Sequence, residues 1–245
     1  MTNLEAKQKL AKKLDIDYDN IANNGLVSDA DLQDAIQTGV QVAWDMHAWD
    51  FKEGAKTGTL SSGNVSAGYV DYPQDMVTGG ATYLVVNSEE FPPEYKISYR
   101  DYLKWKQDNP NATDKYWSEY KRFLFFNMNA AAAGQTFDVY GMLRCITLSN
   151  DSDLLPFSPD ADDQEDSGNN AIVDLAYAEL LEGEKYKNEE KANTVRNKAT
   201  ARLEKVWEPM KQYKATQQPK NRPFFAEVPD FFGSGTDPKY IIGNF

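Results

Sequence analysis

The spacing of apolar residues changes twice along this chain, from helical to alternating and back to helical. Helical spacing of three and four residues runs through 28–49, 171–182 and 187–213, and it is most regular in the last segment. Between the first two segments the period shifts towards two, which is typical of strands that bury one face. This order predicts an α+β fold: a helical bundle core with a β-rich insertion that projects from it.

Local signals set the limits of the expected elements. Ser28 precedes an apolar helical run and is followed by Asp29 and Asp31, the pattern of an N-cap with acidic residues in the first turn. Strict alternation from Phe137 to Cys145 predicts a strand. The other expected elements are strands at 82–86, 96–99 and within 116–127, a short helix near 102–107, and a Gly/Ser/Thr-rich loop at 54–68.

These signals divide the chain into four parts. We expect an N-terminal amphipathic helix within 1–25, a helical core built from 26–53 and 169–214, and a β-rich insertion with loops at 54–168. The last part, 215–245, is expected to be an extended C-terminal arm.

The predicted arm combines prolines with aromatic residues. Pro219, Pro223, Pro229 and Pro238 exclude long helices and central strands. Its rings are nevertheless too numerous for a solvated linker. We therefore expect the arm to lay its rings into grooves of a neighbouring subunit, and the alternative is that it packs back on its own bundle. Its candidate interface residues are Phe224, Phe225, Phe231, Phe232 and Phe245.

Charge and cysteine content limit the classes of partner. With 38 acidic and 26 basic residues the formal net charge is −12, so the chain is not expected to wrap nucleic acid, which needs clustered cations. Cys145 is the single cysteine and excludes an intrachain disulfide, as in chains that mature in a reducing compartment. We expect no secretory signal and no membrane span, and therefore synthesis in the cytoplasm.

Catalytic and metal-binding patterns are weak. His47 is the only histidine and lies far in sequence from Cys145, so no zinc-site spacing exists, and no nucleophile elbow or phosphate-binding glycine loop is present. The acidic loop 158–170 lacks the EF-hand spacing; a solvated loop is the favoured reading, and a bound hard cation stays open. We expect no enzyme activity, cofactor or metal.

Aromatic residues between 95 and 120 alternate with lysines and arginines. Such rings stack on bases or sugars, and they are equally common in protein interfaces and in cores. We select Trp105, Trp117 and Tyr120 as interface candidates. Two functions follow from this segment: a structural subunit that binds other proteins, or a glycan- or receptor-binding module.

The order of the motifs from 28 to 213 resembles the head–tail adaptor (connector) proteins of tailed bacteriophages. The order is a helix ending in a tryptophan-rich patch, a threonine-rich strand region leading to Tyr and Pro-Asp, an Asp-rich turn into proline, a helix, and a long charged helix. These motifs are Trp44, Trp49 and Phe51; Thr57, Thr59, Tyr69, Tyr72, Pro73 and Asp75; Asp151, Asp153, Leu155 and Pro156; 171–178; and about 187–213. The segment 130–134, the long acidic loop 158–170 and the tail 215–245 depart from the family.

The resemblance implies a homo-oligomeric ring, typically of about twelve copies, in the virion at the head–tail junction. Such a ring lies below the portal protein, bridges it to tail or nozzle proteins, and has no enzyme activity. DNA passes through its lumen without sequence-specific binding, and a carboxylate-rich lumen would repel the phosphate backbone.

Overall fold

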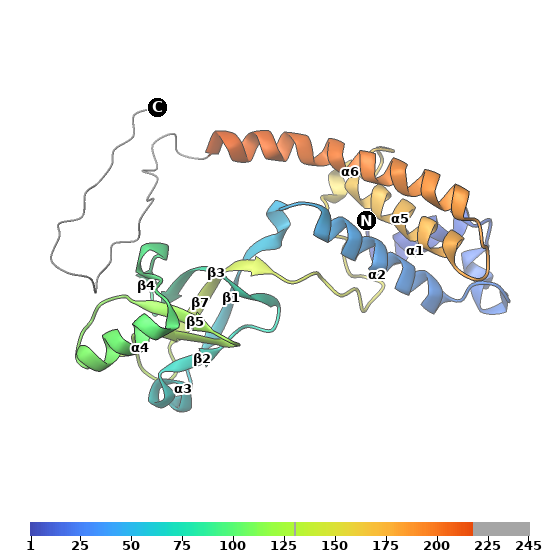
Figure 1. Ribbon diagram of the computed structural model, residues 1–245. Coiled ribbons are helices and arrows are strands. Elements are labelled where there is room, and N and C mark those ends of the chain that lie inside the picture. The colour runs from blue at the N-terminus through green and yellow to red at the C-terminus, as the bar shows by residue number, and fades with distance from the viewer. Residues whose placement is uncertain (130, 218–245) are drawn as a thin grey trace.

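The computed structural model describes residues 1–129 and 131–217 as two bodies, a helical bundle and a β-rich domain (Figure 1). This confirms the predicted α+β fold, in which the β-rich segment projects from the bundle. No helix of the described residues is long and apolar enough to cross a membrane. The predicted arm from 218 onward lies outside the described residues.

The bundle is built around one central helix. Helix α5 is apolar nearly all round because α1, α2 and α6 pack on it from different sides. Helix α2 approaches it closely: a Cβ on Gly39 would come within 2.6 Å of the backbone oxygen of Ile172, so only glycine allows this approach. The helices are α1 (Asn3–Lys13), α2 (Asp29–Met46), α5 (Gly168–Glu182) and α6 (Glu189–Gln217), with short 3-10 turns η1 (Tyr18–Asn23), η2 (Asp50–Lys52), η3 (Pro93–Tyr95) and η4 (Pro159–Ala161) elsewhere in the chain.

The predicted start of α2 is confirmed. The Ser28 hydroxyl accepts a bond from the Asp31 amide at 3.2 Å, and the Asp31 carboxylate accepts one from the Ser28 amide at 2.8 Å. This reciprocal capping box satisfies two amides that the first helical turn leaves without partners.

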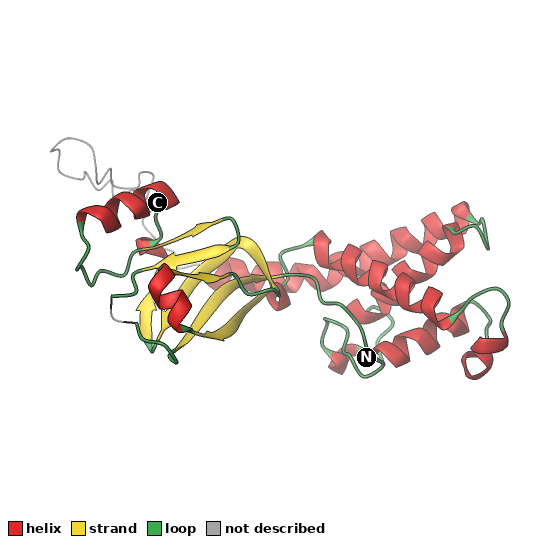
Figure 2. Cartoon of the chain, turned by 90° about the horizontal axis from the view of Figure 1, so that it is seen from below, coloured by secondary structure: helices red, strands yellow, loops and turns green. Residues whose placement is uncertain are grey.

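Two antiparallel sheets form the β-rich domain (Figure 2). Their facing sides enclose a second hydrophobic core that includes Leu84, Val139, Leu124 and Phe126, separate from the core of the bundle. The larger sheet has the order β1 (Glu53–Thr59), β7 (Thr136–Leu143), β3 (Met76–Val86), β4 (Glu89–Phe91); the smaller has the order β2 (Tyr69–Asp71), β6 (Phe123–Phe126), β5 (Trp117–Tyr120). Two short helices, α3 (Ser62–Ala67) and α4 (Tyr99–Asp108), complete the domain.

Two local predictions are wrong. The segment 54–68 is not a loop but contains β1 and α3. The glycines of β1 make room for side chains of β7: a Cβ on Gly58 would meet the Phe137 ring at 2.4 Å, and one on Gly54 would meet the Leu143 side chain at 2.9 Å. The strand expected at 96–99 is also absent, because the Ser98 side chain caps α4 and the helix begins at Tyr99.

Two segment boundaries also differ from those expected. Residues 144–167, assigned to the insertion, return along the bundle, where Leu148, Leu155 and Phe157 enter the helical core. The amide of Gln37 holds this return segment: Nε2 donates to the oxygen of Ile146 and Oε1 accepts from the amide of Leu148, both at 2.9 Å. At the other boundary, helix α6 continues through 215–217.

Candidate interface on the β-rich domain

The smaller sheet is apolar on both of its faces. Along β6, Leu124 and Phe126 are fully buried against the larger sheet, whereas Phe123 and Phe125 point the other way and are partly exposed. A strand with large apolar side chains on both faces normally has protein on both sides. Here the outward side is only partly covered.

The outward side chains form a continuous group of rings. Tyr99 of α4 stacks on Tyr120 of β5 with a centroid distance of 4.4 Å, and lies 4.6 Å from Phe125. Tyr69 of β2 lies 4.7 Å from Phe123 and 5.5 Å from Phe125. We call these five residues the aromatic face.

Helix α4 covers one side of the aromatic face and leaves the other open. Tyr102 and Trp105 point inward and are buried, with the Tyr102 ring 6.2 Å from Phe125. Burial raises the pKa of the Tyr102 phenol well above its usual range. The open side includes Tyr120, which is 44% exposed, and one helical turn after Tyr99 the side chain of Leu103 is 47% exposed.

Cations border the open side. Lys121 and Arg122, in the turn between β5 and β6, are both exposed, and the Lys121 ammonium lies 5.4 Å from the centre of the Tyr120 ring. The domain therefore presents exposed rings next to positive charge in a chain whose net charge is −12. Aromatic residues and arginine are the residue types enriched in protein interfaces.

The structure separates the three interface candidates of this segment. Tyr120 lies on the aromatic face. Trp117 does not: its side chain is fully buried in the β-domain core, and its Nε1 donates to the oxygen of Pro92 at 3.0 Å. Trp105 is only 9% exposed and packs on Tyr116 at 5.0 Å. Both tryptophan side chains are thus buried in the folded chain, whereas Tyr120 is exposed.

Phe123, Phe125 and Tyr69 were not among the sequence candidates. The aromatic run Phe123–Phe126 indicates a strand, but four apolar residues in a row do not show which pair faces outward. The five phenylalanines selected in the tail, Phe224, Phe225, Phe231, Phe232 and Phe245, lie outside the described residues.

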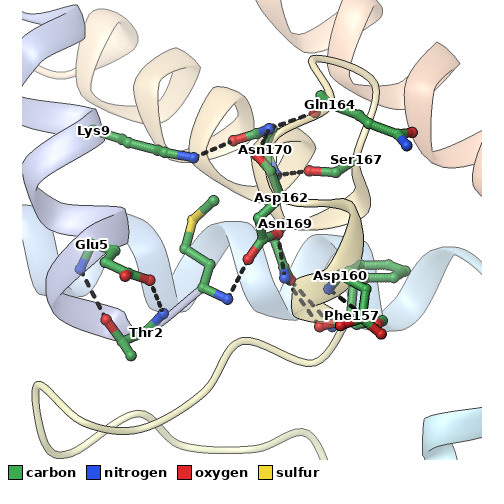
Figure 3. A network of polar contacts seen from close by, with 12 residues as sticks. Thr2, Glu5, Lys9, Phe157, Asp160, Asp162, Gln164, Ser167, Asn169 and Asn170 are labelled. Atoms are coloured by element: carbon green, nitrogen blue, oxygen red, sulfur yellow. Dashed lines mark hydrogen bonds and ion pairs between the residues drawn. The ribbon is translucent and has the colours of Figure 1, made fainter.

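The acidic loop is held by cations of the chain itself. Glu165 pairs with Arg202 of α6 at 2.7 Å, and Asp166 pairs with Lys205 at 3.1 Å, which lowers the pKa of Asp166. Asp162 pairs with the amino group of Met1 and accepts a bond from Asn169 at 2.9 Å (Figure 3). Within residues 1–129 and 131–217, no group of three or more His, Cys, Asp or Glu side chains is placed to hold a metal ion.

His47 belongs to an aromatic cluster where α2 meets α6. Its ring lies parallel to Trp207 at 5.0 Å and edge-on to Trp49 at 5.0 Å, and Nε2 is 3.3 Å from a carboxylate oxygen of Glu204. Trp49, fully buried, also packs on Phe157 of the return segment at 4.9 Å. The histidine thus has a structural setting at the junction of the bundle with the chain that leads to β1.

An open groove of about 320 Å³ lies between α2 and α5, at the end of the bundle away from the β-rich domain. Val27, Ala35 and Leu180 contribute apolar lining, and Asp31 and Lys185, which also line it, form an ion pair at 2.7 Å.

Comparison with known protein families and with curated proteins finds no match to this chain.

Proposed function

We propose that this chain is a non-catalytic structural subunit, a head–tail adaptor that assembles with other copies into a ring below the portal of a tailed bacteriophage. The aromatic face carries the proposal. It is an apolar sheet face that one chain leaves partly open, and exposed aromatic groups of this kind mark protein contact sites. The order of motifs between 28 and 213 supplies the assignment to this class of subunit.

The charge of the chain suits a ring that surrounds DNA. A net charge of −12 per copy, repeated around a lumen, repels the phosphate backbone and lets the duplex slide. In this role the ring bridges the portal to tail or nozzle proteins, and its copies reach the virion after synthesis in the host cytoplasm.

Sizing of the full chain tests the proposal. Native mass spectrometry should detect a closed ring, either for the chain alone or after the portal protein of the same phage is added. A chain that stays monomeric in both conditions, and that does not bind the portal, would contradict the proposal.

The stacked pair Tyr99 and Tyr120 favours a second function, a glycan- or receptor-binding module, because exposed parallel rings can also stack on sugars. Trp105 contacts Tyr102, whose ring in turn lies 6.2 Å from Phe125, so we expect tryptophan fluorescence to respond to a ligand bound on this surface. Saturable quenching by an oligosaccharide, lost in Tyr120→Ser, would support the second function. An adaptor predicts no quenching by any member of an oligosaccharide panel.

A further inference from the structure

We propose that the aromatic face is the docking site for the C-terminal segment 219–245 of a second copy of this chain. This inference rests on the self-assembly in the proposed function and names the contact that links neighbouring copies. In this contact the aromatic rings of the C-terminal segment of one copy pack against the rings of the aromatic face of the next copy.

The apolar content of the two partners matches. The face offers four rings on the outward side of β2, β6 and β5 and a fifth, Tyr99, on α4, with Tyr120 and Leu103 the most exposed apolar side chains there. The segment offers two pairs of adjacent phenylalanines, 224–225 and 231–232, followed by further apolar residues near its end. Phenylalanine and tyrosine rings gain both buried area and ring–ring contacts when they pack together.

Two acidic residues of the segment can pair with the cations of the face. Glu227 and Asp230 stand within two residues of the phenylalanine pairs, in a segment whose three acidic residues are balanced by Lys220, Arg222 and Lys239. On the face, Lys121 and Arg122 are exposed beside Tyr120. Pairs between these two acidic residues and the two cations would set the register of the peptide on the face.

The reach of the segment and the place where α6 ends favour a neighbouring copy. Helix α6 ends at Gln217, and β2 and α3 lie on the side of the β-rich domain that faces away from α6 (Figures 1 and 2). The residues after Gln217 span at most about 90 Å when extended, which is enough to cross to an adjacent subunit. Docking on its own face would instead require the segment to pass around the β-rich domain.

Two full-length variants test whether the C-terminal segment of one copy binds the aromatic face of another. A tail variant carries Phe224→Ser, Phe225→Ser, Phe231→Ser and Phe232→Ser. A face variant carries Tyr120→Ser and Lys121→Glu, both at exposed positions, so that folding is kept. The matched control is Tyr140→Ser, because Tyr140 is 40% exposed on the outer face of the larger sheet. Circular dichroism and thermal melting confirm that each variant is folded.

Native mass spectrometry of the variants then gives distinct outcomes. Tyr140→Ser should assemble like the unsubstituted chain, and each of the two variants should be monomeric alone. A one-to-one mixture should form pairs that stop at two copies, because only one intact segment and one intact face remain to meet. Normal assembly of either variant alone, or no pairing in the mixture, would overturn the inference.

A binding measurement separates this contact from ring formation. A fluorescent peptide of residues 219–245 should bind the tail variant saturably. Adding Tyr120→Ser to that variant should weaken binding at least tenfold, and adding Tyr140→Ser should leave it unchanged. Absence of binding at millimolar protein would overturn the docking site even if rings form. Specific binding without any ring, alone or on the portal, would keep the docking site and contradict the adaptor.

Discussion

The ring of Tyr99 lies parallel to the ring of Tyr120, with centroids 4.4 Å apart and planes only 7° from parallel. This contact joins the first residue of α4 to the last residue of β5. The helix therefore holds the ring of Tyr120 in one orientation on the sheet. A ring that is already held in place loses little side-chain entropy when a partner packs on it. Tyr120 is therefore suited to act as an anchor of the aromatic face.

Substitution of Trp117 should mainly reduce stability, and substitution of Tyr120 should mainly reduce association. Trp117→Ala removes a fully buried ring and should lower the free energy of unfolding by about 3–5 kcal/mol. Tyr120→Ala should lower it by less than about 1 kcal/mol, yet weaken association by about 2 kcal/mol. Urea unfolding and native mass spectrometry measure the two quantities. A stable Trp117→Ala chain that no longer assembles would make Trp117 an interface residue after all.

Arg202 should be the most costly charged residue to replace in α6. Its side chain is 11% exposed and pairs with Asp174, which is 8% exposed, and with Glu165. Arg202→Met leaves the Asp174 carboxylate with Lys13 as its cation, and we expect a loss of about 3 kcal/mol in unfolding free energy.

The matched control for this prediction is Arg196→Met, which breaks an exposed pair with Glu182 and should cost at most about 1 kcal/mol. Chemical denaturation of both variants checks the difference. Equal costs would show that the link between the acidic loop and α6 does not stabilise the bundle.

Asp31 should contribute to stability in a pH-dependent way. The bond from Lys185, with those from Ser28, lowers the pKa of Asp31 from 3.8 to about 2. Because the pKa is lower in the folded state, the stabilisation is complete above about pH 4 and is lost as the pH falls through 2. The pair is partly exposed, so its size is at most about 1 kcal/mol.

Comparison of the unsubstituted chain with Asp31→Asn isolates this contribution from the other carboxylates. The difference in unfolding free energy should be largest at pH 5 and should shrink towards pH 2. A difference that stays constant over this range would mean that the ion pair with Lys185 does not form in solution.

His47→Ala should reduce stability without affecting association. The variant loses the parallel contact with Trp207 and the edge contact with Trp49, which predicts a cost of about 1–2 kcal/mol. His47→Phe keeps a ring at this position and should recover part of the loss. Thermal melting and sizing of both variants check the prediction; loss of function in a stable, normally assembling His47→Ala chain would instead indicate catalysis.

The helical part of the fold could be read from the sequence because its signals are local. The regular spacing in 187–213 and the cap at Ser28 predict α6 and α2 directly, and both helices form. Strand β1 could not be read in this way. Its glycines are typical of a loop, and their role depends on Phe137 and Leu143 of β7, more than 70 residues later, whose side chains lie against them.

The aromatic face shows the same limit at the candidate site. Trp117 and Tyr120 lie three residues apart in one short strand, so that alternation puts them on opposite faces of the sheet. Which face is inside depends on the packing of β6 against the larger sheet, and which part stays open depends on how far α4 extends. Alternation alone therefore does not show which of the three candidates is exposed; in the folded chain Tyr120 is exposed, and Trp105 and Trp117 are buried.

Electron cryomicroscopy of virions that contain this chain tests the central proposal most directly. We expect a ring of copies between portal and tail at a single vertex, with the β-rich domains of adjacent copies in contact and density for a neighbouring chain on Tyr120 and Phe123. Copies found as isolated projections at the tail tip or on the capsid surface, with the aromatic face free of protein, would contradict it.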